Sequence, residues 1–165
     1  KALPRFGFRA VLLAPTGRAA KVMSNYTGRK ALTIHKKIYR KKSAVDIDMS
    51  FQLAPNLAEH TLFIIDEASM IGLDTNTQGA YASPGLLESL FEYVFSGDNC
   101  KLLFVGDTAQ LPPVGLLDSP ALNPGYLENE FHLCVYPYEL TTVVRQSQDS
   151  GILYNATKIR NVQVT

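Results

Sequence analysis

The sequence has little cysteine and no long apolar run. Its two cysteines, Cys100 and Cys134, have no C-x-x-C partner and no nearby histidine, which argues against a disulfide framework and a zinc site. We expect both thiols to be buried and reduced. No apolar stretch reaches the roughly 18 to 20 residues that span a bilayer, and the first residues lack a signal-peptide apolar region. We therefore expect a soluble, cytoplasmic protein with no membrane partner.

Acidic residues are absent from the first 45 positions. This segment holds 12 of the 16 Lys and Arg, while the later positions hold the other 4 and all 15 acids, which gives formal charges of +12 and −11. Such asymmetry predicts a polyanionic partner for the basic part. Composition leaves the alternative open, a solvated basic face that lies early in the chain. The length of 165 residues and the 46% hydrophobic content match one globular domain with a substantial core.

Short apolar runs predict buried strands. They occupy residues 9–17, 61–67, 101–107 and 131–140. Uninterrupted rather than alternating apolarity is typical of strands covered on both faces, as in a parallel sheet. The stretches between them predict helices at residues 17–28, 33–42 and 84–97, with Thr16 and Thr33 as N-caps. Strands that alternate with helices predict an α/β fold, with a mostly parallel open sheet and flanking helices. The polar residues 72–85 predict a loop.

Polar residues follow three of the expected strands. They are Thr16, Gly17 and Arg18 after the first, Asp66 and Glu67 after the second, and Gly106, Asp107 and Gln110 after the third. In open α/β sheets, ligands bind at the carboxyl ends of the strands. One carboxylate of an Asp-Glu pair there suits Mg²⁺, which prefers oxygen ligands, and the other suits the water that attacks a nucleoside triphosphate. Each group alone is also explained as a strand-end cap.

Four strings in order carry a resemblance to a known family. They read "LLAPTGRAAKVMSNYTGRKALTIHKKIY", "LFIIDEASMIG", "LLFVGDTAQLPPVG" and "ELTTVVRQ". They resemble motifs Ia, Ib, II, III and IV of the RecD-like superfamily 1 DNA helicases, which include the exodeoxyribonuclease V alpha subunit. The resemblance covers most of residues 9–150, and PTGRAA and GD-x-x-QLPPV are uncommon strings. It implies a RecA-like P-loop NTPase sheet, with residues 1–165 as part of one motor domain.

The resemblance implies roles in the use of ATP and Mg²⁺. Asp66 would serve the magnesium ion and Glu67 the catalytic water. Gln110 would sense the γ-phosphate and couple its presence to the DNA groove, and Asp107 would lie in the same nucleotide site. Arg145 would neutralise charge on the transferring phosphoryl group. Without the motif order, Gln110 would be a loop amide and Arg145 a surface cation.

The resemblance also implies contacts with single-stranded DNA. The residues concerned are Pro15, Thr16, Gly17, Arg18, Lys21, Thr33 and His35. A helix that opens at PTGRAA points backbone N–H groups and the positive end of its dipole at a phosphate, and binding of this kind weakens as salt rises. A satisfied structural histidine is the alternative for His35. The lysines past Arg40 favour a solvated basic face.

A Walker A motif is missing from the sequence. The pattern G-x-x-x-x-G-K-[ST] supplies a backbone cradle, a lysine and a hydroxyl for phosphates and magnesium, and neither TGRAAK nor TGRKAL matches it. We therefore expect a piece of a longer ATP-dependent DNA helicase, without its phosphate loop, with a sheet incomplete at the N-terminus and without a second motor domain. Such a chain should be catalytically inactive and should self-associate through exposed strand edges.

Two further functions stay open at the level of the sequence. One is a module that binds single-stranded nucleic acid and hydrolyses nothing, and the other is a P-loop ATPase that is no helicase. PTGRAA and the TIH segment argue against the second. The helicase resemblance implies a place in DNA repair and recombination. It leaves open whether exonuclease or helicase subunits attach, the polarity of translocation, and DNA or RNA preference.

Overall fold

A computed structural model describes most of the chain in two units. The described residues are 3–41, 51–73, 85–110, 112–113, 115–141, 155 and 158. The first unit ends at Leu133 and contains all the named helices and strands, and the second runs from Cys134 to Thr165. In the described part of the second unit, residues 134–141 have no regular secondary structure. Arg145 lies outside the described residues, as do Pro84 and most of the loop expected at 72–85.

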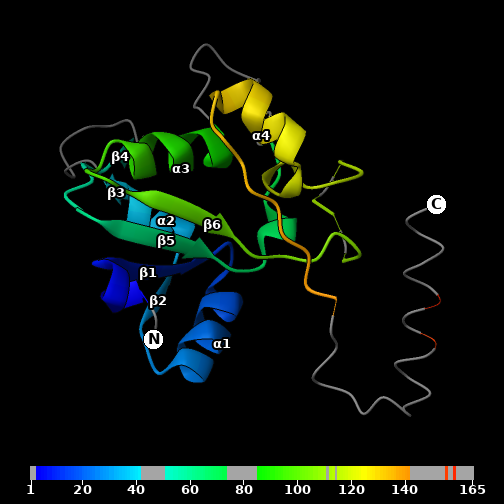
Figure 1. Cartoon of the computed structure of the whole chain (residues 1–165), viewed down its shortest axis with the longest axis horizontal. Coiled ribbons are helices and arrows are strands. Elements are labelled where there is room, and N and C mark those ends of the chain that lie inside the picture. The colour runs from blue at the N-terminus through cyan, green and yellow to red at the C-terminus, as the bar shows by residue number, and fades with distance from the viewer. Residues whose placement is uncertain are drawn as a thin grey trace. The chain divides into compact units, whose positions relative to one another are not determined.

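The first unit is built on a four-stranded parallel sheet (Figure 1). Its strands are β1 (Arg9–Ala14), β2 (Ala31–Thr33), β5 (Thr61–Ile65) and β6 (Lys101–Phe104), in the order β2-β1-β5-β6. All three pairings are parallel, with Leu12 opposite Ala31, Leu13 opposite Ile65, and Ile65 opposite Phe104. The sequence prediction of a mostly parallel α/β sheet is confirmed.

Helices cover both faces of this sheet. On one face, Leu12 and Ala14 of β1 pack with Ala20 and Met23 of α1 (Gly17–Thr27). On the other face, Phe63 of β5 meets Tyr93 edge-on at 6.0 Å between ring centroids. Tyr93 belongs to α3 (Leu86–Phe95), which packs with α2 (Ile34–Ile38). The buried strand residues that the apolar runs predicted therefore form two cores, one on each side of the sheet.

Two threonines begin helices where the sequence placed them. The Thr16 hydroxyl accepts a hydrogen bond from the Ala19 N–H at 3.2 Å, and the Thr33 hydroxyl accepts one from the Lys36 N–H at 3.2 Å. Gly28 ends α1 in the left-handed conformation, with φ at 65°, which glycine adopts without steric cost. The expected N-caps and the expected end of the first helix are confirmed.

The second helix is shorter than predicted. It ends at Ile38 rather than at residue 42, because Tyr39–Lys41 form a strand, β3, that pairs antiparallel with β4 (Phe51–Leu53). The Ala54 N–H donates to the Ile38 carbonyl at 2.7 Å, which extends this hairpin to the helix end. Pairing with a distant segment therefore outcompetes the local helical pattern.

The prediction of a strand at residues 131–140 is wrong. Phe131 is the last residue of a helix, α4 (Pro124–Phe131), which Asn123 caps and which follows the short 3-10 helix Pro120–Leu122. Its ring stacks on Phe91 with centroids 3.8 Å apart, so the first apolar residue of the run belongs to a helix contact. Residues 132–141 have no strand partner among the described residues, and Pro137 lacks the N–H that a ladder needs.

The two thiols are free, and only one is buried. Cys100 lies between α3 and β6, buried against the Ala58 carbonyl, whereas Cys134 is exposed. The expectation of burial is therefore wrong for Cys134, which falls in the segment without regular structure. Across the residues that the structure places, no helix is both long and apolar enough to span a membrane.

Candidate functional site

The parallel strands bring their carboxyl ends to one edge of the sheet. Ala14 at the end of β1 lies opposite Thr33 at the end of β2. On the other side of β1, the Leu13 carbonyl accepts a hydrogen bond from the Asp66 N–H at 3.0 Å. The predicted groups after β2, β1, β5 and β6 therefore follow one another along this edge in the order of the strands.

The Asp66-Glu67 turn is held tightly after β5. Asp66 Oδ1 accepts the Glu67 N–H at 3.0 Å, and the Ala68 N–H donates to the Val105 carbonyl at 2.9 Å. Between these bonds Glu67 adopts φ 55° and ψ 40°, in the left-handed region that non-glycine residues rarely enter. The short 3-10 helix Ala68–Met70 follows at once. Backbone strain of this kind is concentrated at functional sites.

Gly106 allows the end of β6 to approach this turn. A Cβ there would lie 2.9 Å from the Ser69 nitrogen and 2.8 Å from Leu122 Cδ1, so only glycine fits. The buried Ser119 hydroxyl lies 2.9 Å from the Ala68 carbonyl oxygen and 2.7 Å from the Ile71 carbonyl oxygen, which ties the turn from its far side. Sequence reasoning missed Ser119, which no motif signals, and Ser69. The position of Gly106, directly after a strand, was a usable signal.

Asp107 organises the loop after β6. Its Oδ1 accepts the Ala109 N–H at 3.0 Å, and its carbonyl accepts the Gln110 N–H at 3.1 Å. The Gln110 side chain is exposed. The structure therefore brings Asp66, Glu67 and Asp107 to neighbouring strand ends and places Gln110 in the turn beside them.

The donor set at the ends of β5 and β6 suits a magnesium ion. Carboxylate oxygens are the ligands that this cation prefers, and it keeps several waters when few protein ligands are present. The Ser69 hydroxyl is buried beside this turn and has no hydrogen-bond partner among the residues that the structure describes. In the described residues no three His, Cys, Asp or Glu side chains cluster closely enough to hold a metal. Water or phosphate oxygens would have to complete the coordination.

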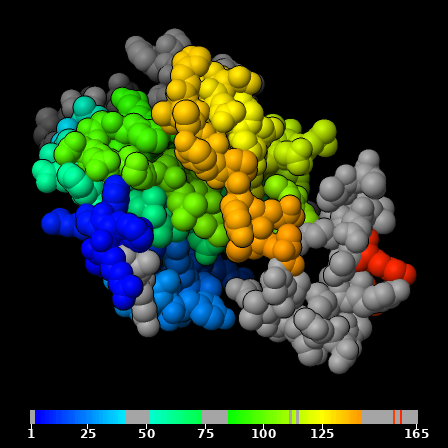
Figure 2. All heavy atoms as spheres, in the orientation of Figure 1, coloured from blue at the N-terminus to red at the C-terminus, as the bar shows by residue number. Residues whose placement is uncertain are grey.

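The other half of the edge carries cations and helix N-termini. Pro15, Thr16 and Gly17 form the turn into α1, and Arg18 and Lys21 are exposed on its first turns. Arg18 has no acidic neighbour in the first turn to offset its charge against the helix dipole. In the space-filling view, α1 forms open surface of the first unit (Figure 2).

Thr33 and His35 lie next to this surface because β2 is paired with β1. The His35 side chain is exposed, and its ring centroid lies 5.7 Å from that of Tyr39 at an angle of 43°. The hydroxyls of Thr16 and Thr33 accept helix N–H bonds, so each keeps its O–H as a donor toward an anion. The predicted nucleic-acid residues therefore fall on two adjacent strand ends.

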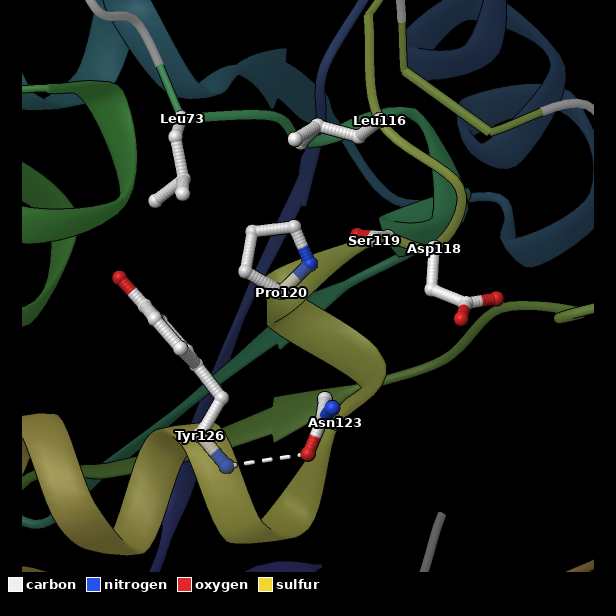
Figure 3. Close-up of a pocket in the computed structure, with 7 residues that line it drawn as sticks. All are labelled: Leu73, Leu116, Asp118, Ser119, Pro120, Asn123 and Tyr126. Atoms are coloured by element: carbon white, nitrogen blue, oxygen red, sulfur yellow. Dashed lines mark hydrogen bonds between the residues drawn. The ribbon is translucent and has the colours of Figure 1, made fainter.

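A cavity of about 170 Å³ lies on the far side of the turn after β5, next to Ser119 (Figure 3). It is lined by Leu73, Leu116, Asp118, Ser119, Pro120, Asn123 and Tyr126. Burial raises the pKa of Tyr126, and the charges of Glu88 and Glu130 raise it further. The Tyr126 N–H donates to Asn123 Oδ1 at 3.0 Å, which caps α4. None of the predicted site residues that the structure describes lines this cavity.

Comparisons with known proteins point to one group of enzymes. A family model described as AAA domain matches residues 1–116. The chain is 29% identical over 160 residues to the ATP-dependent DNA helicase dda of Enterobacteria phage T4, covering 94% of this chain and 32% of that protein. It is 36% identical over 108 residues to the ATP-dependent RecD2 DNA helicase of Deinococcus radiodurans, covering 66% of this chain and 13% of that protein. The chain thus spans less than a third of the length of either relative.

Proposed function

Because the chain belongs to the AAA domain family and is a RecD-like superfamily 1 helicase motor domain, we propose that it binds Mg²⁺-ATP and single-stranded DNA on neighbouring halves of one sheet edge. The longer protein would couple ATP hydrolysis to movement along the strand and to duplex unwinding. The observation that carries this proposal is the order of the strand ends, with carboxylates after β5 and β6 and cations after β1 and β2.

On the nucleotide side, each residue would have a separate task. Asp66 would hold the cation, since the Glu67 N–H fixes one of its oxygens and thereby orients the carboxylate. Glu67 would orient and deprotonate the attacking water, and its strained backbone fixes where its side chain begins. When bound, Mg²⁺ would neutralise negative charge on the phosphate oxygens.

Two residues would respond to the γ-phosphate. Gln110 would hydrogen-bond to it from the turn that Asp107 organises, and Arg145 would neutralise charge that develops on the transferring group. The phosphate cradle itself is missing from this sequence, which contains no Walker A pattern. Because positioning and charge do nearly all the work in phosphoryl transfer, we expect residues 1–165 alone to have no measurable turnover.

On the nucleic-acid side, α1 and α2 would face the phosphate backbone. Arg18 and Lys21 would pair with phosphates near the N-terminus of α1, and the Thr16 and Thr33 hydroxyls would donate to phosphate oxygens. His35 would meet a base or sugar beside Tyr39. The Leu13 carbonyl, which accepts the Asp66 N–H, belongs to the strand that leads into α1. Strand β1 thus links the nucleotide half of the sheet edge to the DNA half.

Binding and catalysis are separable in one experiment. Fluorescence anisotropy with labelled single-stranded DNA, at low and moderate salt, is measured together with ATP turnover on the same purified chain. We expect salt-sensitive binding without turnover. Absence of binding at low salt would refute the DNA half of the proposal. Turnover that Glu67→Gln abolishes would refute the expectation of inactivity and would require a phosphate cradle elsewhere in these residues.

A further inference from the structure

The turn that joins α1 to β2 carries two cations in a fixed position, at the opposite end of the sheet from β6 (Figure 1). Arg29 and Lys30 are both exposed there. The Arg29 N–H donates to Thr27 Oγ1 at 3.2 Å, and the Ala31 N–H donates to Ser24 Oγ at 2.9 Å. The backbone on both sides of the pair is therefore tied to α1, and it has little freedom left to lose when the two side chains meet a ligand.

The side of α1 that faces β2 is polar. Ser24 marks this side, since its hydroxyl oxygen accepts the Ala31 N–H of β2. Lys21 lies three residues before Ser24 and is therefore its neighbour on the helix surface. Val22 and Tyr26 are the exposed apolar residues of α1. Each is two residues from Ser24, a rotation of about 200° around the helix, so both stand on the opposite side.

We call the polar side of the helix and the turn after it the basic flank, which consists of Lys21, Asn25, Arg29 and Lys30. All four side chains are exposed, and residues 1–45 contain no Asp or Glu. Within the described part of the chain, none of the three cations forms an ion pair. Nearby cations are engaged, since Arg40 Nη2 donates to Gln52 Oε1 at 3.3 Å and Lys37 lies over the Tyr93 ring. The basic flank therefore offers its charge to a partner.

The composition of the basic flank favours a phosphate backbone over a protein or a single strand. A protein interface is built around an apolar centre, and the exposed apolar side chains of α1 stand on the other side of the helix. Single strands bind where bases stack on aromatic side chains, and the basic flank contains no aromatic residue. A phosphate backbone is bound by cations alone.

The spacing of the cations fits a double strand. Lys21 and Arg29 are eight residues apart, which corresponds to about 12 Å along a helix axis. The major groove of B-DNA is also about 12 Å wide, and the phosphates of the two strands line its two sides. Cations at the two ends of the basic flank can thus reach both strands of a duplex. The flank begins at Lys21, beside the residues expected to contact single-stranded DNA.

We propose that the basic flank binds the phosphate backbone of double-stranded DNA, while the neighbouring sheet edge holds the single strand that continues from it. The inference rests on the proposed function for the place of the single strand, but it assigns a second surface to a separate ligand. Binding of a duplex at the flank requires neither ATP nor the strand ends. Failure of single-strand binding would therefore leave the flank standing, and each ligand is measured by itself.

Fluorescence anisotropy of the full 165-residue chain with a labelled blunt DNA duplex tests the flank. We expect the double variant Arg29→Ala, Lys30→Ala to weaken duplex binding at low salt by about tenfold or more, and to reduce the salt slope of the logarithm of the binding constant by about 1.8, the value of two phosphates. Binding of single-stranded DNA should stay unchanged. Absence of duplex binding, an unchanged duplex affinity in the variant, or an equal loss with single-stranded DNA would each overturn the proposal.

The double variant Arg5→Ala, Lys101→Ala is the matched control, because it also removes one arginine and one lysine from exposed positions. It should keep its duplex affinity, since Arg5 lies in the 3-10 helix Leu3–Phe6 and Lys101 in β6. An equal loss in both double variants would reveal an effect of net charge alone and overturn the proposal. A polyglutamate peptide that displaces the duplex as well as unlabelled duplex does would overturn it in favour of an acidic protein partner.

Amide NMR of the unaltered chain covers the case in which the double variant fails to fold. The blunt duplex should shift the amide signals of residues 28–31, which single-stranded DNA should leave unchanged. Shifts confined to residues 16–21 and 33–37 with both kinds of DNA would place the duplex on the single-strand site and overturn the proposal.

Discussion

At the residue scale, two residues of the candidate site are locally unfavourable where they stand. Glu67 has a left-handed backbone, and Arg18 puts a positive charge at the positive end of a helix. A residue in the left-handed region costs about 1 to 2 kcal/mol, and an unfavourable charge at a helix end costs about 0.3 to 1 kcal/mol. Costs of this kind, concentrated at one sheet edge, agree with a role in binding and catalysis rather than in folding.

Replacing Arg18 with alanine should separate binding from stability. We expect Arg18→Ala to weaken single-stranded DNA binding and to lower the salt slope of log K by about 0.7, the value of one phosphate contact. The free energy of unfolding should stay unchanged or rise by a few tenths of a kcal/mol, because an unfavourable dipole contact is removed. Anisotropy titrations and urea denaturation measure the two quantities. Arg5→Ala, at an exposed cation in the 3-10 helix Leu3–Phe6, is the control. An equal loss of affinity in both variants would contradict a local contact at Arg18.

Replacing Glu67 with glycine should relieve backbone strain. We expect Glu67→Gly to raise the free energy of unfolding by about 0.5 kcal/mol, since relief of the left-handed strain exceeds the entropic cost of glycine. Glu67→Gln, which keeps the strain, should leave stability unchanged. The matched control is Glu92→Gly at an exposed position inside α3, which should lose about 1 kcal/mol. Urea denaturation that shows equal losses for both glycine variants would contradict the strain at Glu67.

At the element scale, local signals predicted helix starts better than they predicted strands. Thr16 and Thr33 were identifiable as caps because a cap needs only one side chain and the N–H three residues later. The run at 131–140 misled because its composition favours a strand, whereas Phe131 is the last residue of α4 and stacks on Phe91. The hairpin of β3 and β4 was missed for the related reason that pairing over twelve residues leaves no local signature.

One contact between elements depends on Gly97, which the sequence marks as the end of a helix but not as a point of close packing. A Cβ on Gly97 would lie 2.5 Å from Asn56 Nδ2 and 2.8 Å from the Ala58 carbonyl oxygen. Asn56 cannot move away freely, because it donates to the carbonyls of Tyr93 at 3.0 Å and Val94 at 3.2 Å. The end of α3 is thereby fastened to the segment before β5.

Gly97→Ala should therefore destabilise the first unit. We expect a loss of about 2 kcal/mol in the free energy of unfolding, the typical cost of forcing an extra methyl group into a packed site. Gly125→Ala is the matched control, because a Cβ there meets only Asn123 Oδ1 at an ordinary 3.6 Å. Thermal or urea unfolding gives both values. A tolerated Gly97→Ala would show that Asn56 does not fasten this helix end.

At the scale of the whole molecule, the charge division along the sequence becomes a division across the sheet. The basic first 45 residues supply β1, α1, β2 and α2, and the acidic remainder supplies the ends of β5 and β6. The sequence therefore predicted on which strands of the sheet the basic and the acidic residues would gather. It could not predict the Ser119 contacts to the turn after β5, because they join residues about fifty positions apart.

The salt dependence of DNA binding follows from this division. We expect three cations, among them Arg18 and Lys21, to neutralise one phosphate each. The logarithm of the DNA-binding constant should then fall with the logarithm of the salt concentration at a slope of about −2. Anisotropy titrations at several salt concentrations measure this slope. A slope near zero would mean that base stacking, rather than phosphate contact, dominates the affinity.

The central claim is that two ligands occupy neighbouring halves of one sheet edge, and amide NMR tests it most directly. Single-stranded DNA should shift the amide signals of residues 16–21 and 33–37, and Mg²⁺-ATP should shift those of residues 66–69 and 107–110. Residues 24–28, at the far end of α1, should stay unchanged with both ligands. Shifts from DNA that cluster away from the ends of β1 and β2, or shifts from both ligands in the same residues, would contradict the account.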